Sequence, residues 1–248
     1  MRYQGGKSRI AGAIAAKIRE LHPTATEIWE PFCGGGAVTL ALAKAGFRVH
    51  ASDSHEDLIL MWQALMRGET DPFVDVTEAE FKALKHAPSS ARRGFVRFGS
   101  SFGGDFNAGY GRNGVASKPG REFCWQDSQR SVRKLAAFKT ITFAHQDYSK
   151  TPTSVLVYAD PPYADTYAYQ GKTFDHASFW TWVKQRSGPT FVSELTCPHE
   201  DIDIVWRKAH KSQNASNSPT SRATAKIITR EERLYYKPAC SLPAVVSS

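Results

Sequence analysis

The stretch Val155-Leu156-Val157-Tyr158-Ala159-Asp160-Pro161-Pro162-Tyr163 decides how the chain is interpreted. Its first residues are apolar and partly β-branched, a composition typical of a buried strand. Two consecutive prolines end the strand, because each fixes φ and has no N–H to donate. Pro161 also restricts the backbone of Asp160. The stretch predicts a carboxylate held in a stiff frame at a strand end beside the ring of Tyr163, although alone it also suits an ordinary Pro-rich turn.

A second candidate site is a glycine-rich turn nearer the N-terminus. A predicted strand over 27–32 is followed by Cys33-Gly34-Gly35-Gly36, a helical apolar pattern, and a second strand over 47–51 that leads to Asp53. This order is the first half of a nucleotide-binding α/β sheet, and Asp53 lies where a carboxylate hydrogen-bonds ribose hydroxyls. The third glycine of the dinucleotide fingerprint is replaced by Thr39. An adenosine-type ligand is therefore favoured over a merely structural turn, and the missing glycine counts against a pyrophosphate.

Gly5-Gly6-Lys7-Ser8 near the N-terminus suggests a phosphate-binding P-loop, but no room remains before it for the strand and first glycine that this motif needs. The turn instead places Lys7 at the start of a helix predicted over 10–21. There the ammonium could meet a carboxylate or another acidic group.

The positive charge of the chain is concentrated in one segment. The net charge is +8. Between Lys82 and Lys139 the sequence has twelve Lys or Arg against three Asp or Glu, a net charge of +9, so the remainder carries −1. Such a basic block indicates a polyanionic partner, although any single cation can be part of a solvated face.

Within this block, the segment 97–112 interleaves aromatic residues, glycines and basic residues. We expect loops or a hairpin here rather than a regular helix. Arg side chains can bind phosphates or guanine edges, and aromatic rings can stack on unpaired bases. Some of the phenylalanines are expected to pack a small local core instead.

The remaining features define the class of protein. The 248 residues can bury a large core, and the four scattered cysteines fit a reducing compartment. No apolar run is long enough for a membrane span and no secretory leader is evident, so we expect a cytoplasmic protein without a membrane partner. The eight histidines have no paired ligand spacing, and we assign no metal. Further strands are expected at 141–144 and at 190–193, the latter followed by Glu194, and the Ser- and Asn-rich segment 210–225 is expected to be a loop.

Taken in order, these motifs resemble the Dam-type DNA adenine-N6 methyltransferases (D12 class, alpha group). The resemblance extends over nearly the whole chain, and Val192-Ser193-Glu194 is similar to phage-borne members. It implies an α/β fold: a Rossmann-like methyltransferase sheet with helices on both faces, formed by 1–67 and 140–248. An inserted target-recognition subdomain would occupy 68–139. The motifs that carry the resemblance are Tyr3-x-Gly-Gly-Lys7, Glu30-Pro-Phe-x-Gly-Gly-Gly36, Asp53, the aromatic basic segment, Asp147-Tyr148 and Asp160-Pro-Pro-Tyr163.

The resemblance also implies S-adenosylmethionine as cofactor and double-stranded DNA as partner. The residues implied in cofactor binding are Tyr3 and Lys7 at the methionine end, Phe32 with Gly34, Gly35 and Gly36, Asp53 at the ribose, Asp147 and Tyr148 at the adenine, and Asp160. The residues implied in DNA binding are Arg97, Phe98, Asn107, Tyr110, Arg112 and Lys118. Gly99 departs from the family pattern, which has Asn there.

The catalytic residues implied are Asp160, Pro161, Pro162 and Tyr163. Adenine N6 is a poor nucleophile because its lone pair is delocalised into the ring. Hydrogen bonds from the amine to the Asp160 carboxylate and the Pro161 carbonyl would aim the lone pair at the methyl group. The adenine would leave the duplex stack and lie on the ring of Tyr163.

Three alternatives remain open at this point. Cytosine-N4 methylation would use the same strand-end motif. A nicotinamide-dependent oxidoreductase could be built on the same first half-sheet, although it has no use for the basic aromatic segment. A catalytically inactive DNA-binding protein could keep the scaffold. The recognition sequence, the oligomeric state and the biological role (restriction-modification, regulation or phage self-protection) are not indicated.

Overall fold

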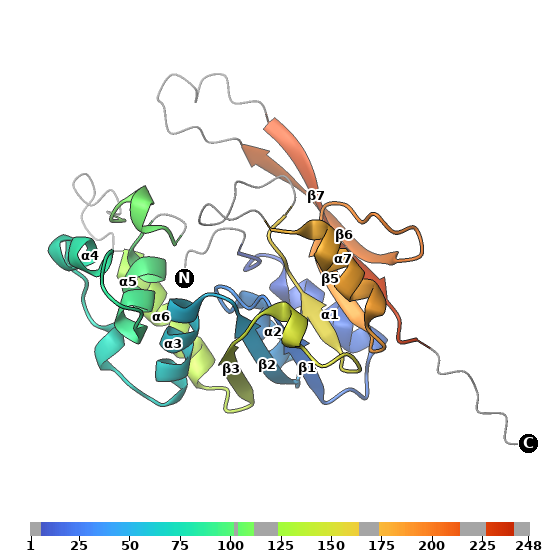
Figure 1. The fold of residues 1–248 in the computed structure, drawn as a ribbon, viewed down its shortest axis with the longest axis horizontal. Helices are drawn as coiled ribbons and strands as arrows, with labels where there is room; N and C mark the ends of the chain where they lie inside the picture. Colours follow the sequence, from blue (N-terminus) through green and yellow to red (C-terminus); the bar gives the residue numbers. More distant parts are fainter. Residues whose placement is uncertain (1–5, 102–103, 112–123, 164–173, 214–226, 241–248) are drawn as a thin grey trace, which may run out of the picture.

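A seven-stranded sheet with the order β3-β2-β1-β4-β5-β7-β6 forms the centre of this computed structural model (Figure 1). The structure describes residues 6–101, 104–111, 124–163, 174–213 and 227–240. Strand β7 is antiparallel to both of its neighbours, and the other pairs are parallel. The strands are β1 (Glu27–Glu30), β2 (Arg48–Asp53), β3 (Ile141–His145), β4 (Val157–Ala159), β5 (Thr190–Glu194), β6 (Asp203–Gln213) and β7 (Ile227–Lys237).

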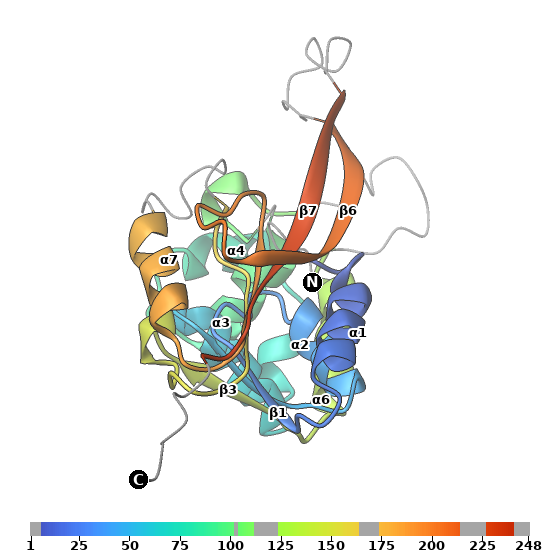
Figure 2. The same cartoon turned by 90° about the vertical axis from the view of Figure 1, so that its right-hand side faces the viewer.

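Helices cover both faces of the sheet, as the alternation of side chains along each strand requires. Leu156 and Tyr158 belong to the core that includes α1 and α2, whereas Val157 and Ala159 pack with α7. Figure 2 shows α1 and α7 on opposite sides of the sheet. The helices are α1 (Ala11–Leu21), α2 (Ala37–Lys44), α3 (Glu56–Met66), α4 (Glu78–Leu84), α5 (Ala91–Ser100), α6 (Cys124–Ala136) and α7 (His176–Gln185), with 3-10 turns η1 (Asp71–Phe73), η2 (Phe106–Ala108) and η3 (Tyr148–Lys150).

Between β2 and β3 the chain forms a helical lobe, which consists of α4, α5 and α6 with η1 and η2 and lies beside the β3 edge (Figure 1). The lobe is fixed to α3 by a buried ion pair between Arg93 and Asp57. Gly94 makes this contact possible, because a Cβ at this position would overlap the backbone of Asp57. Thr77 caps α4 by accepting a hydrogen bond from the Glu80 N–H at 3.1 Å, as the capping-box pattern of the sequence indicates.

Three details of the sequence-based secondary structure need correction. Residues 97–100, expected in loops or a hairpin, form the last turn of α5. The helix tolerates its glycines because its buried face, including Phe95 and Phe98, packs closely against neighbouring helices. Strand β4 begins at Val157 rather than Val155, and β6 continues through 210–213, which were expected to be a loop.

Strands β6 and β7 extend beyond the sheet as a two-stranded ribbon. β7 pairs with β5 only from Thr190↔Lys237 to Glu194↔Arg233, whereas its pairing with β6 continues outward to Gln213↔Ile227. Figures 1 and 2 show this ribbon projecting from the body of the molecule. Across the ranges that the structure describes, no helix combines the length and the apolar character of a membrane span.

Candidate functional site

The two motifs singled out in the sequence follow neighbouring strands. β1 leads into the glycine turn, β4 leads into Asp160, and the strands are adjacent through the pair Trp29↔Val157. The strand order reverses between them, since β2 and β3 lie on one side and β5 on the other. In open α/β sheets ligands bind at such a switch point, outside the carboxyl ends of the strands.

The glycine turn is held in one conformation by its surroundings. The Gly34 N–H donates to Asp53 Oδ2 at 3.1 Å, and Trp62 Nε1 donates to the Gly34 carbonyl at 3.1 Å. Gly36 has φ +71°, and a Cβ on it would lie 2.7 Å from Leu135 Cδ1. Asp53 also accepts from the His55 N–H at 3.0 Å. The carboxylate predicted to hold a ribose is thus placed at the turn, and it orders the backbone there.

An aromatic cluster brings two separate cofactor motifs together. The rings of Phe32 and Tyr148 stack with centroids 5.3 Å apart, and Phe174 and Phe179 contact both of them edge-on or tilted. Asp147, the exposed neighbour of Tyr148, caps η3 through its side chain. The structure therefore joins residues after β1 and after β3 that are more than a hundred positions apart. Tyr3 lies outside the described residues.

Asp160 is paired with Lys7 rather than being open to solvent. Lys7 Nζ lies 3.0 Å from Asp160 Oδ1, and the two side chains are 6% and 17% exposed. The backbone carbonyl of Lys7 accepts the N–H groups of Ile10 and Ala11, so the lysine sits in the turn that opens α1. The same ammonium is 4.3 Å from the ring centroid of Tyr163, a cation–π distance.

A second carboxylate completes this cluster. Glu232 of β7 accepts a hydrogen bond from the Tyr163 hydroxyl at 2.6 Å and lies 3.9 Å from Lys7 Nζ. One lysine therefore faces two carboxylates, and Tyr163 is fixed at both its ring and its hydroxyl. Pro161 is buried and Pro162 half-buried beside them.

Burial raises the pKa of the carboxyl groups around the switch point. It raises the pKa of Asp53 to about 6, against the lowering effect of the His55 and Gly34 N–H groups. It raises the pKa of Asp160 as well, but the Lys7 ammonium opposes that rise. The pKa of Glu30, at the end of β1, is raised well above its ordinary value by burial, with the charges of Asp160 and Asp53 adding to it. The carboxyl ends of β1, β2 and β4 thus carry acids whose charged forms a cationic ligand would stabilise.

The raised pKa of Glu194 should make the stability of the fold depend on pH. Its side chain is buried, and burial raises its pKa to about 7, with the charges of Asp160 and Glu232 adding to the shift. Because the folded pKa lies above the unfolded one, its contribution is complete below the unfolded value of about 4.5 and is lost as the pH rises through about 7. In the wild type, the unfolding free energy should therefore fall between pH 5 and pH 8. We expect this fall to be smaller by roughly 3 kcal/mol in Glu194→Gln, as measured by urea denaturation. Parallel curves for the two proteins would contradict it.

Of the four residues implied in DNA binding that the structure describes, one, Asn107, is exposed. Phe98 is fully buried, packs against His55 with ring centroids 4.9 Å apart, and so cannot stack on a base; this prediction is wrong. Arg97 donates to the Gly104 carbonyl at 2.9 Å, and the Tyr110 hydroxyl donates to the Val76 carbonyl at 2.6 Å. Both side chains hold the lobe together in this structure, whereas Asn107 is exposed. Arg112 and Lys118 lie outside the described residues.

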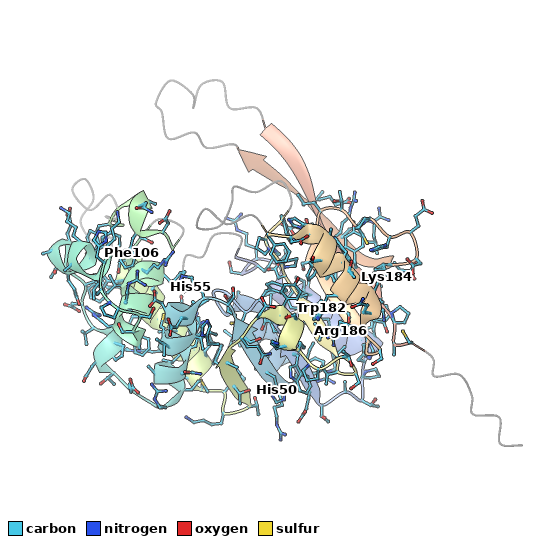
Figure 3. The ribbon with its side chains drawn as sticks, viewed as in Figure 1. His50, His55, Phe106, Trp182, Lys184 and Arg186 are labelled. Carbon is cyan, nitrogen blue, oxygen red and sulfur yellow. The ribbon has the colours of Figure 1, made fainter. Side chains whose placement is uncertain are left out.

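The expected local core of phenylalanines does exist in the lobe. Phe106 packs on Phe81 with centroids 5.0 Å apart, and Figure 3 shows Phe106 within the lobe. The guanidinium groups of Arg93 and Arg97 lie 5.3 and 5.8 Å from its ring. These aromatic and basic residues therefore pack against one another inside the lobe.

Three acids of the site were given no role by reasoning from the sequence: Glu30 and Glu194, which were noted only within motifs, and Glu232. Glu30 and Glu194 end β1 and β5, so both have the signal that identified Asp53 and Asp160, an acid at the carboxyl end of a strand. Glu232 lies inside an amphipathic strand near the C-terminus, and no local pattern distinguishes it. Only the placement of β7 beside β5 brings it to the site.

Comparison with known proteins agrees with this arrangement. Residues 3–110 match the family described as D12 class N6 adenine-specific DNA methyltransferase, a stretch that includes Lys7, the glycine turn and Asp53. No curated protein matches the sequence.

Solved structures similar over most of the chain are distant. A candidate RNA methyltransferase from Pyrococcus horikoshii has a TM-score of 0.46 at 10% identity, covering 94% of this chain and 85% of that one. Precorrin-6y C5,15-methyltransferase from Geobacter metallireducens has a TM-score of 0.40 at 8% identity, and the match covers 93% of this chain and 87% of that one. The glycopeptide N-methyltransferase MtfA bound to S-adenosylmethionine has a TM-score of 0.35 at 12% identity, and the match covers 90% of this chain and 76% of that one. Likenesses this distant say nothing about the substrate.

The fold prediction, an α/β Rossmann-like sheet with helices on both faces, is confirmed by the strand order and by the packing of α1 and α7. The cofactor prediction agrees with the family match, because methyltransferases of this class take their methyl group from S-adenosylmethionine. The match over residues 3–110 confirms the resemblance inferred from the sequence: this part of the chain is similar to the D12 class N6 adenine-specific DNA methyltransferases.

Proposed function

We propose that this chain is a site-specific DNA methyltransferase that transfers a methyl group to the N6 amine of an adenine flipped out of duplex DNA. The observation that carries the proposal is the placement of Asp160 and the glycine turn at the carboxyl ends of adjacent strands β4 and β1, where the strand order reverses. A donor beside the turn and an acceptor amine beside Asp160 would then be neighbours.

The residues present fit S-adenosylmethionine. Asp53 lies at the end of β2 beside the glycine turn, where its carboxylate could also accept from ribose hydroxyls, and the stacked pair Phe32 and Tyr148 offers apolar ring surface for an adenine. The acids Asp160, Glu194 and Glu232 favour a ligand that carries an ammonium and a sulfonium, and they disfavour a pyrophosphate. This charge pattern counts against the nicotinamide-dependent oxidoreductase. When bound, the cofactor supplies a methyl group activated by positive charge.

Asp160 and Pro161 would orient the attacking amine. The Asp160 carboxylate and the Pro161 carbonyl each accept one hydrogen bond from N6, which localises the lone pair on nitrogen and directs it toward the methyl group. The Lys7 ammonium, 3.0 Å away, opposes the rise that burial causes in the pKa of Asp160 and so favours its charged form. The methylated amine is strongly acidic, so the proton it loses can pass to Asp160 or to water without a strong base.

The segment 68–139 is proposed as the target-recognition subdomain. It holds the whole basic block, and its helical lobe lies beside the β3 edge (Figure 1). Asn107 is its exposed candidate for contact with DNA, while Arg97 and Tyr110 maintain the shape of the lobe. Tyr163 offers its ring to the flipped base.

Incubation of the purified protein with radiolabelled S-adenosylmethionine and mixed-sequence duplex DNA should give labelled N6-methyladenine after nucleoside analysis by mass spectrometry. Labelled N4-methylcytosine in its place would overturn the choice of base. Saturable binding of a nicotinamide dinucleotide without methyl transfer would favour the oxidoreductase. DNA binding without transfer would indicate an inactive scaffold.

A further inference from the structure

Glu232 lies at the site although it is remote in sequence from every motif used above. The last pair between β7 and β5 is Glu194↔Arg233, and Glu232 is the next residue of β7 toward the ribbon. There it is paired with Lys208 of β6. Its side chain is 16% exposed. It receives the Tyr163 hydroxyl at 2.6 Å and lies 3.9 Å from the Lys7 ammonium.

We infer that Glu232 is a positioning residue for methyl transfer, which fixes the ring of Tyr163 through its hydroxyl and shares Lys7 with Asp160. The inference rests on the proposed function, because it assigns the ring of Tyr163 to the flipped base. It adds a residue of the last strand, β7, to the pair formed by Lys7 of the N-terminal turn and Asp160 after β4.

The hydrogen bond to Tyr163 explains how the ring is oriented. A hydroxyl that donates to an ionised carboxylate makes a shorter and stronger hydrogen bond than one that donates to a neutral acceptor. The Lys7 ammonium over the same ring restricts it from one face. A base stacking on the other face would then meet a surface that is ordered before it arrives, which lowers the entropic cost of binding.

The charge of Glu232 also has a role that a neutral acceptor would not have. Burial raises the pKa of Asp160, and the nearby charge of Glu232 raises it further, while Lys7 lowers it. A purely structural acceptor for Tyr163 could be an amide, which would avoid this repulsion. The carboxylate instead holds Lys7 between two acids, and so it adjusts how firmly the lysine is bound to Asp160. The titratable groups that face Asp160 are Lys7, Glu30, Tyr158, Tyr163, Glu194 and Glu232.

The experiment compares Glu232→Leu, Glu232→Gln and Tyr163→Phe with the matched control Glu231→Gln. Glu231 is the neighbouring acid on β7, pairs with Arg233 at 2.8 Å, and by strand alternation lies on the other face. Each variant is assayed for single-turnover methyl transfer from pH 5 to 9, and for the fluorescence of a duplex with 2-aminopurine at the target adenine. Thermal melting checks that each variant is folded.

We expect Glu232→Leu to lower the transfer rate ten- to a hundredfold. The same change should lower the 2-aminopurine signal a few-fold. In the Tyr163→Phe background the same change should have much less effect, because the hydroxyl through which Glu232 acts is already gone. Glu232→Gln should move the acid limb of the rate profile to lower pH, since removing its charge lowers the pKa of Asp160. Glu231→Gln should match the wild type in all assays.

Additive losses for Glu232→Leu and Tyr163→Phe, or an acid limb unmoved by Glu232→Gln, would overturn the inference and leave the proposed function intact. The same holds if both Glu232 variants behave like Glu231→Gln. A wild-type protein that transfers no methyl group would overturn the proposed function and the inference with it.

Discussion

Replacement of Asp160 by alanine should lower the rate of methyl transfer by about 10³-fold or more while DNA binding persists. Loss of one preorganised group that stabilises the transition state costs about 10²- to 10³-fold in comparable sites. In the proposed mechanism Asp160 both accepts a hydrogen bond from the amine and positions the base. The loss of rate should therefore reach the upper end of that range. Single-turnover rates measure the first effect, and a gel-shift or anisotropy titration measures the second.

The variant Asp160→Asn refines this expectation. An amide oxygen can still accept one hydrogen bond, but it is uncharged and no longer pairs with Lys7, which lies 3.0 Å away in the native protein. We therefore expect an intermediate rate, between that of the wild type and that of Asp160→Ala. Undiminished transfer by Asp160→Ala, with folding verified by circular dichroism, would remove Asp160 from the mechanism.

Replacement of Gly36 by alanine should destabilise the fold by about 2–4 kcal/mol. The φ of +71° disfavours a side chain by roughly 1–2 kcal/mol, and the new Cβ would be forced against Leu135 and Trp62. Trp62 also holds the Gly34 carbonyl, so the displacement should reach the glycine turn and weaken binding of S-adenosylmethionine. Urea denaturation and calorimetric titration measure the two effects.

Gly12→Ala is the matched control for this substitution. Gly12 lies in α1, where a Cβ would have nothing within 4 Å. Alanine is favoured over glycine inside a helix, so we expect a gain of about 0.5–1 kcal/mol and unchanged cofactor binding. Equal destabilisation by both alanines would mean that neither the φ of Gly36 nor its close contacts determine the effect.

Much of the catalytic half of the fold could be predicted because its signals are local. The apolar run before Asp160 and the glycine turn before an apolar helix each predict an element and its end. Asp53 and Asp160 were placed correctly at the carboxyl ends of β2 and β4, since an acid directly after a buried strand is at the sheet edge whatever the tertiary packing.

The rest depends on contacts between segments distant in sequence. The turn before α1 predicted that Lys7 could meet an acidic group, but no spacing in the sequence indicates that its partner is Asp160. Glu232 reaches the site only because β7 is inserted next to β5. In the lobe, the family resemblance implied that Phe98 contacts DNA, whereas the glycines of α5 allow this helix to pack closely and Phe98 is buried.

The ribbon of β6 and β7 has a consequence for the order in which the protein opens. From Glu232 outward to Ile227, β7 has one neighbouring strand, whereas from Arg233 to Lys237 it has two. An isolated pair of strands is only marginally stable in water. In native-state hydrogen–deuterium exchange, the amides of 227–232 should therefore exchange in a low-energy opening, and those of 233–237 only in a larger unfolding event. The boundary between these two units falls at Glu232, so the acid that faces Tyr163 lies where the molecule changes from rigid to easily opened.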